Sequence, residues 1–324
     1  MAILGIESSA HTLGIGIVDK QKVLANERSM YKISNKGLIP ARVADYHADN
    51  LETVLTSALK ASDLKIDDIE AIGYTKGPGL GACLQVGMIA AKSLSERYNL
   101  PIFPINHAVA HVEITKTLFG MKDPLALYVS GGNSQILATA TKPYRHYHIY
   151  GETFDIGVGN MLDTFARAAK LNPPWGSTVA RKSIGGRYIS MPYTVKGMDF
   201  TFTGLMTHAE GMLGKKSISD IAYSLQETAF SMLCEATERA LFLTKKRELI
   251  LCGGVAQSKR LREMLKEVSR SHKIMFGVAP DEFNADNGAM IALVAERLFR
   301  SGYTFSESEI TINQRYRIDR TMIL

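Results

Sequence analysis

Two segments of the chain share one design, in which a small polar turn joins two short apolar strands. The first runs through Ile6-Glu7-Ser8-Ser9 into residues 13–18, and the second runs through residues 128–134 into Gln135-Ile136-Leu137. Backbone amides in such turns can hold phosphate oxygens, although one turn alone is more often an ordinary hairpin. Two matching turns, together with the strand-to-helix junction at Gly253-Gly254, predict two similar lobes that hold a phosphate-bearing ligand.

Strand-like and helix-like patterns alternate along the rest of the chain, which favours an α/β fold. We expect strands at 3–7, 14–19, 71–75, 102–105, 125–130, 135–140 and 249–252, and helices at 51–59, 81–97, 160–170, 219–244 and 287–300. A length of 324 residues is enough for two lobes with a core in each. The predicted organisation is an N-terminal lobe at 1–122, joined by 301–324, and a C-terminal lobe at 123–300. An irregular insertion rich in Gly, Pro and Ser is expected around 172–203.

Bulk properties indicate a cytoplasmic protein without a membrane span. The formal net charge of +6 is compatible with nucleic acid but does not require it. The three cysteines, Cys83, Cys234 and Cys252, are too far apart for a metal motif and favour a reducing compartment. The N-terminus lacks the pattern of a signal peptide, and no apolar run reaches the roughly 18 residues that a span needs.

His107 and His111 are four residues apart in a segment with a helical pattern, so both imidazoles would lie on one helix face and could share a metal ion. Zinc proteases use the related sequence His-Glu-x-x-His, in which the glutamate is the general base. Ala108 occupies that position here, which argues against a protease. Two buried helix histidines without a metal remain the alternative interpretation of the pair.

Seven ordered blocks carry a closer resemblance. They are Gly5-Ile6-Glu7-Ser8-Ser9; Gly77-Pro78-Gly79-Leu80 with Val86-Gly87; Asn106-His107 with His111; Tyr128-Val129-Ser130-Gly131-Gly132-Asn133; Gly151-Glu152-Thr153 through Asp163; Asp199-Phe200 with Phe202-Thr203-Gly204-Leu205; and Cys252-Gly253-Gly254-Val255-Ala256 with Asp286-Asn287-Gly288-Ala289. Through these blocks the chain resembles the actin/Hsp70/sugar-kinase (ASKHA) superfamily. Within it, the chain is similar to the TsaD/Gcp family, in the archaeal-eukaryotic branch found in the KEOPS complex.

The resemblance implies a two-lobed α/β fold with nucleotide and metal in the interlobe cleft. It also implies transfer of a threonylcarbamoyl group from threonylcarbamoyl-adenylate to N6 of the adenosine 3′ of the anticodon in ANN-decoding tRNAs. His107, His111 and Asp286 would form the catalytic metal site, with one Fe2+ or Zn2+ per subunit and Tyr128 as a further ligand. Asp286 would close, from the second lobe, a site that begins on the first.

The resemblance also implies an adenine-nucleotide site that takes the adenylate substrate or ATP, ADP or AMP. Its residues would be Ser9, Tyr128, Ser130, Gly131, Gly132, Asn133, Asp163, Gly176, Gly253, Gly254 and Ser258. Two positions depart from the family pattern. Ala180 stands where a ribose-contacting glutamate is common, and Ser258 stands where an asparagine is usual, so the nucleotide contacts should differ.

The implied partners are tRNA and the KEOPS subunits: a small dimerising subunit, an atypical small kinase that is fused to this chain in some relatives, and a further small subunit. Candidate tRNA contacts, which are also typical of solvated faces, are Lys245, Lys246, Arg247, Lys259, Arg260, Arg262, Arg315, Arg317 and Arg320. The alternatives are a metal-dependent endopeptidase, a non-catalytic nucleotide-binding scaffold subunit and a small-molecule kinase.

Overall fold

Strand β1 (Ala2–Glu7) is buried along its whole length, as its run of apolar residues predicts, and it occupies the centre of a five-stranded sheet of order β3-β2-β1-β4-β5. The computed structural model describes residues 2–32 and 38–324. The other strands are β2 (Thr12–Asp19), β3 (Lys22–Met30), β4 (Ile69–Gly77) and β5 (Ile102–Asn106). Strand β1 is antiparallel to β2 and parallel to β4, and β5 runs parallel to β4.

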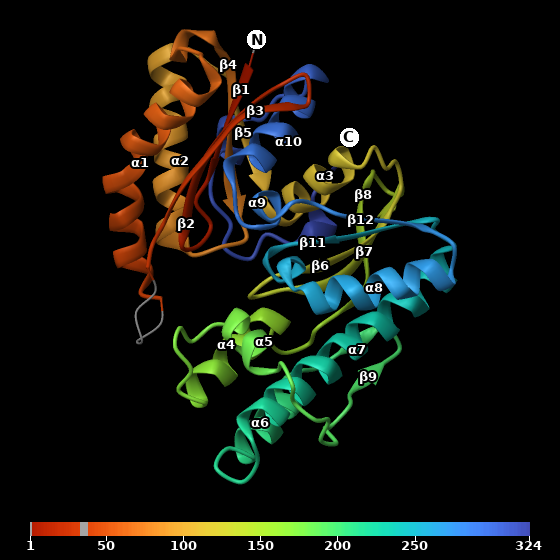
Figure 1. Ribbon diagram of the computed structural model, residues 1–324. Helices are drawn as coiled ribbons and strands as arrows, with labels where there is room; N and C mark the ends of the chain where they lie inside the picture. The colour runs from red at the N-terminus through yellow and green to blue at the C-terminus, as the bar shows by residue number, and fades with distance from the viewer. Residues whose placement is uncertain (1, 33–37) are drawn as a thin grey trace. The chain divides into compact units, whose positions relative to one another are not determined.

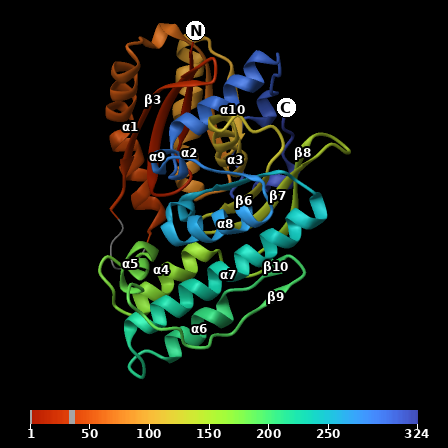
Figure 2. The same ribbon diagram turned by 45° about the vertical axis from the view of Figure 1, so that its right-hand side comes forward.

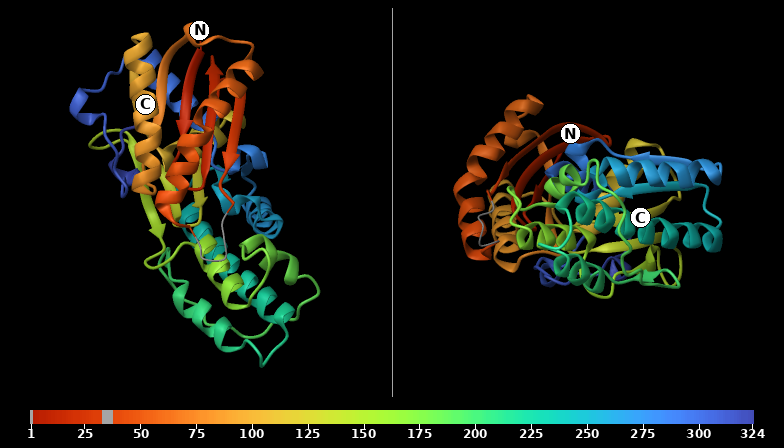
Figure 3. Two further views of the ribbon diagram at one scale, coloured as in Figure 1. Left: turned by 90° about the vertical axis from the view of Figure 1, so that its left-hand side faces the viewer. Right: turned by 60° about the horizontal axis from the view of Figure 1, so that its bottom comes forward.

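Helices cover both faces of this first sheet. Figure 1 shows α1 (Pro40–Ser62) and α2 (Gly81–Tyr98) together on one face, and α10 (Gly288–Arg300) with α3 (His107–Leu118) on the other. Figure 3 shows the two orange helices α1 and α2 running beside the red strands. Short 3-10 turns complete this part of the chain: η1 (Ile66–Asp68), η3 (Glu307–Glu309) and η4 (Ile318–Arg320).

Helix α10 lies unusually close to the first sheet because glycines face it. A Cβ built on Gly5 would lie 2.2 Å from the backbone nitrogen of Ala292, and one on Gly16 would lie 2.1 Å from that of Ala289. No side chain fits at these distances, so glycine is required in both strands. These contacts fix the start of α10, which Asp286 precedes by two residues, against β1 and β2.

The second sheet has the order β12-β11-β6-β7-β8. Its strands are β6 (Leu125–Val129), β7 (Ser134–Ala140), β8 (His146–Glu152), β11 (Glu248–Cys252) and β12 (Met275–Val278). Strand β11 runs parallel to β6 and β12, whereas β6 and β7 form an antiparallel hairpin. Helices α7 (Ile218–Thr244) and α8 (Lys259–Ser271) lie side by side in Figure 2. The remaining elements are α4 (Val158–Ala168), α5 (Gly176–Lys182), β9 (Val195–Lys196), β10 (Asp199–Phe200), α6 (Thr203–Gly211), η2 (Gly254–Gln257) and α9 (Asp281–Asn284).

The chain divides into two compact units. Unit 1 comprises the chain up to Leu118 with Ala140–Tyr147 and Ala285–Leu324, and unit 2 comprises Phe119–Thr139 with His148–Asn284. Residues 285–300 were predicted in the C-terminal lobe, whereas the structure places them in unit 1. The reason is the close glycine contact described above, which joins α10 to the first sheet.

The α/β alternation predicted from the sequence is confirmed, and each expected strand overlaps an observed one. Strands β3, β8 and β12 were not predicted. The insertion at 172–203 was expected to be irregular, but it contains α5 and the β9–β10 hairpin. Among the described residues, no helix is long and apolar enough to cross a membrane.

Candidate metal centre and nucleotide-binding turns

Helix α3 begins directly after β5, and Asn106 at the junction stabilises its start. The Asn106 Oδ1 atom accepts hydrogen bonds from the backbone amides of Ala108 (2.9 Å) and Val109 (3.2 Å), which is the geometry of an N-cap. His107 and His111 follow on one face of this helix, at the four-residue spacing. Both are buried, with exposed fractions of 6% and 1%.

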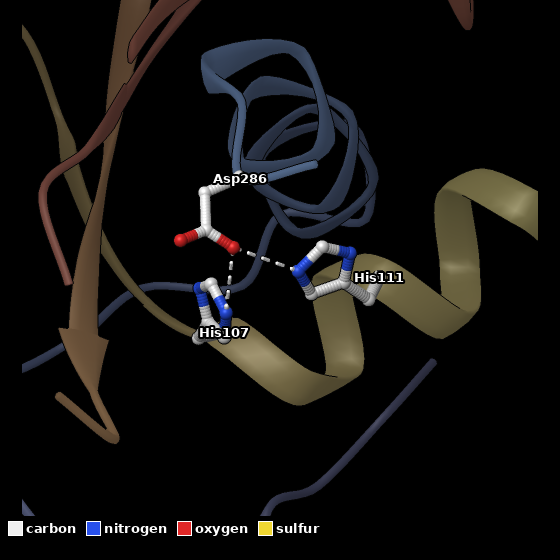
Figure 4. A group of neighbouring side chains, drawn as sticks. All are labelled: His107, His111 and Asp286. Atoms are coloured by element: carbon white, nitrogen blue, oxygen red, sulfur yellow. Dashed lines mark hydrogen bonds and ion pairs between the residues drawn. The ribbon is translucent and has the colours of Figure 1, made fainter. Parts of the chain in front are cut away.

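Asp286 joins the two histidines from the segment that precedes α10 (Figure 4). Its Oδ1 atom lies 3.5 Å from Nε2 of His107 and 3.3 Å from Nε2 of His111. The two imidazole rings are 4.7 Å apart and nearly perpendicular, at 85°. The side chains come together as the sequence analysis proposed, and all three belong to unit 1. The expectation that Asp286 reaches the histidines from the other lobe was therefore wrong.

This donor set fits a divalent transition metal. One ligand atom from each residue lies within 4.8 Å of the others. Two neutral imidazoles and a carboxylate are a common ligand set of catalytic zinc and iron sites, and they leave positions open for substrate. Bonds of 2.0–2.2 Å at tetrahedral angles place neighbouring ligand atoms about 3.4 Å apart. The two distances from Asp286 match this value.

The far side of the His107 ring contacts a second carboxylate. Nδ1 of His107 lies 2.9 Å from Oε2 of Glu7, a side chain with no exposed surface. The same carboxylate accepts hydrogen bonds from the Thr75 hydroxyl (2.7 Å) and from the backbone amide of Ser9 (2.6 Å). His107 is therefore held between Glu7 at one ring nitrogen and Asp286 at the other.

The two histidines differ in charge when no metal is bound. Burial lowers the pKa of His107, but the carboxylates of Glu7 and Asp286 outweigh it and raise that pKa to about 9. Burial lowers the pKa of His111, which is therefore neutral at pH 7. Burial raises the pKa of Asp286, but the neighbouring imidazoles, first among them that of His107, hold it below its ordinary value. The site thus presents a carboxylate, a neutral imidazole and an imidazolium that a metal would deprotonate.

Ser9 and Tyr128 were also predicted at the site. Ser9, expected near phosphates, is buried and places its hydroxyl 3.3 Å from Nδ1 of His107. Tyr128, expected at both the metal and the nucleotide, is a buried residue of β6 in unit 2. Its assignment to either group stays a prediction.

In unit 2, hydrogen bonds between Ser130 and Asn133 hold the β6–β7 turn together. The amide of Ser130 donates to the carbonyl of Asn133 (2.7 Å), and the amide of Asn133 donates back to the Ser130 hydroxyl (3.0 Å). The carbonyl of Gly131 accepts from the amide of Asn160 near the start of α4. A Cβ added at Gly132 would meet nothing within 4 Å, so this face of the turn is open to a ligand.

The Gly253-Gly254 junction lies beside the end of β6. Gly253 has φ of +93°, and a Cβ there would lie 2.4 Å from the carbonyl oxygen of Val129, so only glycine fits. Gly254 borders open space. Ser258, expected to pair with the nucleotide, uses its hydroxyl to cap α8 by accepting from the Leu261 amide at 3.5 Å.

Asp163 and Gly176 were predicted at the nucleotide site from separate motifs, and the structure brings them together. The Asp163 carboxylate accepts a hydrogen bond of 2.6 Å from the Gly176 amide at the start of α5. Helix α4, which carries Asp163, also contacts η2. The predicted nucleotide residues of unit 2 therefore lie on or next to elements that contact one another, since η2 contacts both β6 and α4, and α4 contacts α5. Ala180 lies within α5 and offers no side-chain donor or acceptor.

Several of the basic residues considered for tRNA have acidic partners. Arg260 forms two hydrogen bonds with the Glu227 carboxylate, at 2.7 and 2.8 Å. Lys246 pairs with Asp123, Arg262 with Asp281 and Arg317 with Asp319. These partners neutralise part of the positive charge, which weakens the assignment of those residues to tRNA.

The role of Glu7 was not anticipated from the sequence, although the residue belongs to a recognised motif. The available signal was an ionisable residue at the end of a fully apolar strand, where a carboxylate needs a partner. That partner is 100 residues away, so local patterns cannot identify it.

Comparison with known proteins identifies the family of the chain. The sequence model of the TsaD family, described as tRNA N6-adenosine threonylcarbamoyltransferase, matches residues 22–293. The tRNA N6-adenosine threonylcarbamoyltransferase of Thermococcus sibiricus is 48% identical over 322 residues, which cover 98% of each chain. A probable bifunctional tRNA threonylcarbamoyladenosine biosynthesis protein of Thermoplasma volcanium is 42% identical over 98% of this chain and 60% of that protein.

Two solved structures share the fold at low sequence identity. HypF of T. kodakarensis has a TM-score of 0.61 at 14% identity, over 95% of this chain and 49% of that chain. A ROK family glucokinase of Streptomyces griseus has a TM-score of 0.50 at 12% identity, over 92% of this chain and 100% of that chain. These likenesses confirm the predicted α/β fold of the actin and sugar-kinase class. The family model and the close relatives show in addition that the chain belongs to the TsaD family of tRNA N6-adenosine threonylcarbamoyltransferases.

Proposed function

We propose that the chain transfers the threonylcarbamoyl group of threonylcarbamoyl-adenylate to N6 of the adenosine 3′ of the anticodon in ANN-decoding tRNAs. In this proposal it is the cytoplasmic catalytic subunit of a KEOPS-type complex. The observation that carries the proposal is the cluster of His107, His111 and Asp286 in a member of the TsaD family. The complex would include a small dimerising subunit, an atypical small kinase and a further small subunit.

In the proposed reaction, the adenosine N6 attacks the carbamoyl carbon of the donor. The bond from that carbon to the phosphate oxygen breaks, AMP leaves with the electron pair, and N6 loses one proton. Because an exocyclic adenosine amine is a weak nucleophile, positioning should supply much of the acceleration. The target base must also leave its stack in the anticodon loop to reach a protein site.

The chain's own residues have distinct tasks in this scheme. His107, His111 and Asp286 would hold one Fe2+ or Zn2+, which supplies Lewis-acid stabilisation of negative charge on the donor. The turns at 130–133 and 253–254 would bind the adenylate through their backbone amides. Internal hydrogen bonds fix the conformation of the first turn, and the positive φ of Gly253 fixes that of the second. Nothing lies within 4 Å of a Cβ built on Gly132 or Gly254, so both turns have space for a ligand. Ala108, at 3% exposure, leaves the position of the protease base without a carboxylate.

The test is transfer of labelled threonylcarbamoyl to tRNA by the reconstituted complex. The wild type is compared with His107→Ala/His111→Ala, at matched folding and partner binding. Loss of transfer in the double variant alone supports the proposal. Equal transfer by both proteins would make the histidines structural. Nucleotide binding without transfer by a complete complex would favour a scaffold subunit, and cleavage of a glycoprotein that depends on bound metal would favour a peptidase.

A further inference from the structure

We propose that Glu7 is a positioning residue of the metal centre, which fixes the His107 imidazole so that Nε2 is presented toward Asp286 and His111. The inference rests on the proposed metal centre and adds a residue to it. It is carried by the contact of 2.9 Å between Oε2 of Glu7 and Nδ1 of His107, on the opposite side of the ring from Asp286.

The carboxylate of Glu7 is itself held rigidly. It lies at the end of β1, beside Thr75 of the neighbouring parallel strand β4. Oε2 accepts from the Thr75 hydroxyl at 2.7 Å, and Oε1 accepts from the Ser9 amide at 2.6 Å. Glu7 and Thr75 have no exposed surface. A group fixed by two strands in this way can set the orientation of the ring that it contacts.

Holding Nδ1 decides which nitrogen of His107 is available. An imidazole has two ring nitrogens, and the hydrogen bond at one of them selects the other as the metal ligand. With Nδ1–H donated to Glu7, only Nε2 can coordinate, and a ring flip would break the hydrogen bond to a buried carboxylate. The helix spacing brings the two histidines to one face, whereas Glu7 sets the angle of one ring on that face.

Charge gives Glu7 a second effect on the same ligand. Asp286 alone would leave one positive charge of a buried divalent ion uncompensated, and Glu7 supplies the remaining negative charge from behind His107. A carboxylate at Nδ1 also makes Nε2 a better electron donor. Both effects predict tighter metal binding than the three ligands would achieve without Glu7.

The test measures Co2+ binding to the full-length chain by chelator competition and by the visible absorption of the bound ion. Glu7→Gln keeps the size of the side chain and removes its charge. We expect it to weaken Co2+ binding by about 10- to 100-fold and to change the cobalt spectrum. Glu296→Gln is the matched control, because it removes the charge of another buried carboxylate of unit 1, one that accepts from the backbone amides of Lys20 and Gln21 rather than from His107. It should leave Co2+ affinity within about twofold of wild type.

Wild-type Co2+ affinity and spectrum in Glu7→Gln would overturn the inference, and a lowered melting temperature alone would then mark Glu7 as structural. Equal weakening by Glu7→Gln and Glu296→Gln would also overturn it, because the effect would then come from the loss of any buried negative charge in unit 1. If Glu7→Gln does not fold, Glu7→Asp replaces it under the same criteria, since it keeps the charge but is one methylene shorter. Co2+ binding by a wild-type chain whose complete reconstituted complex fails to transfer would refute the proposed function and leave this inference standing. Absence of Co2+ binding by the wild type would overturn both the metal centre and the role of Glu7.

Discussion

Replacing Gly16 with alanine should destabilise unit 1 and weaken the metal site at the same time. A Cβ on Gly16 would lie 2.1 Å from the backbone nitrogen of Ala289 and 2.4 Å from its Cα. Both atoms belong to the backbone of α10, so no side-chain rotation can relieve the overlap. The helix must move away from the sheet, and Asp286 precedes its first residue by only two positions.

The size of the movement sets the expected magnitude. Unstrained contacts to carbon begin near 3.5 Å, so α10 must retreat by roughly 1.4 Å. Overpacking of a core typically costs about 1–3 kcal/mol, and the upper end or more is expected where rigid backbone is met. Metal ligands tolerate deviations of about 0.2 Å. A shift several times larger at the start of α10 should lower metal affinity by at least about tenfold.

Urea unfolding followed by circular dichroism, together with Co2+ titration, checks this prediction. Two further glycines provide a graded comparison. A Cβ on Gly73 would lie 2.7 Å from the Cβ of Ala295, which is a smaller overlap than the one at Gly16, so Gly73→Ala should cost less than Gly16→Ala. A Cβ on Gly204, in the exposed part of α6, would meet nothing within 4 Å, so Gly204→Ala should stabilise the chain by up to about 1 kcal/mol. Equal stability and equal Co2+ affinity in all three variants would contradict the role given to the close approach of α10 to the sheet.

Three other predictions concern the surroundings of the metal centre. Asn106→Ala should lower the free energy of unfolding by about 1–2 kcal/mol, because it removes the cap of α3 and the hydrogen bond of 2.9 Å to the Thr321 hydroxyl. Thr321→Val removes only that hydrogen bond, so urea unfolding should show a smaller loss of stability. Burial lowers the pKa of His47 to about 4. As pH falls from 6.5 toward 4, His47 therefore becomes protonated in the unfolded chain while it stays neutral in the folded chain. Stability should then fall by up to about 3 kcal/mol over that window, and His47→Gln should remove this part of the slope in urea titrations at several pH values. Excess Zn2+ should raise the melting temperature of the wild type but not that of His111→Ala, because an ion that binds the folded chain through the intact ligand set stabilises it. Equal shifts in both proteins would mean that Zn2+ binds at another site.

How far the sequence predicts the structure depends on how local each signal is. The strands that were predicted are buried and apolar, as in β1 and β6. The missed strand β3 has the sequence Lys-Val-Leu-Ala-Asn-Glu-Arg-Ser-Met. It is mostly half-buried at the edge of its sheet and has a weak apolar pattern. Strand β12 has only four residues, and α5 lies in a segment whose Gly and Pro content suggested a loop.

The same distinction applies to the candidate site. The four-residue step from His107 to His111 is a local signal, and it predicted correctly that the two rings share a helix face. Asp286 is 175 residues from His111, so only the family resemblance could add it to the set. Its place in unit 1 follows from the glycine contacts of α10, which no periodicity in the sequence records.

The three candidate metal ligands are preorganised because each of them stands on an element that is fixed by other contacts in unit 1. Asn106 ties the start of α3 to the C-terminal segment, since its Nδ2 donates to the Thr321 hydroxyl while its Oδ1 caps the helix. The close approach of α10 to β1 and β2 fixes Asp286, and the end of β1 supplies Glu7 behind His107. A site built on such elements should bind metal with little rearrangement of the chain. A substitution that is distant in sequence from the candidate ligands but that moves α10, such as Gly16→Ala, should therefore lower metal affinity. Substitutions on the exposed surface of the same unit should have a smaller effect.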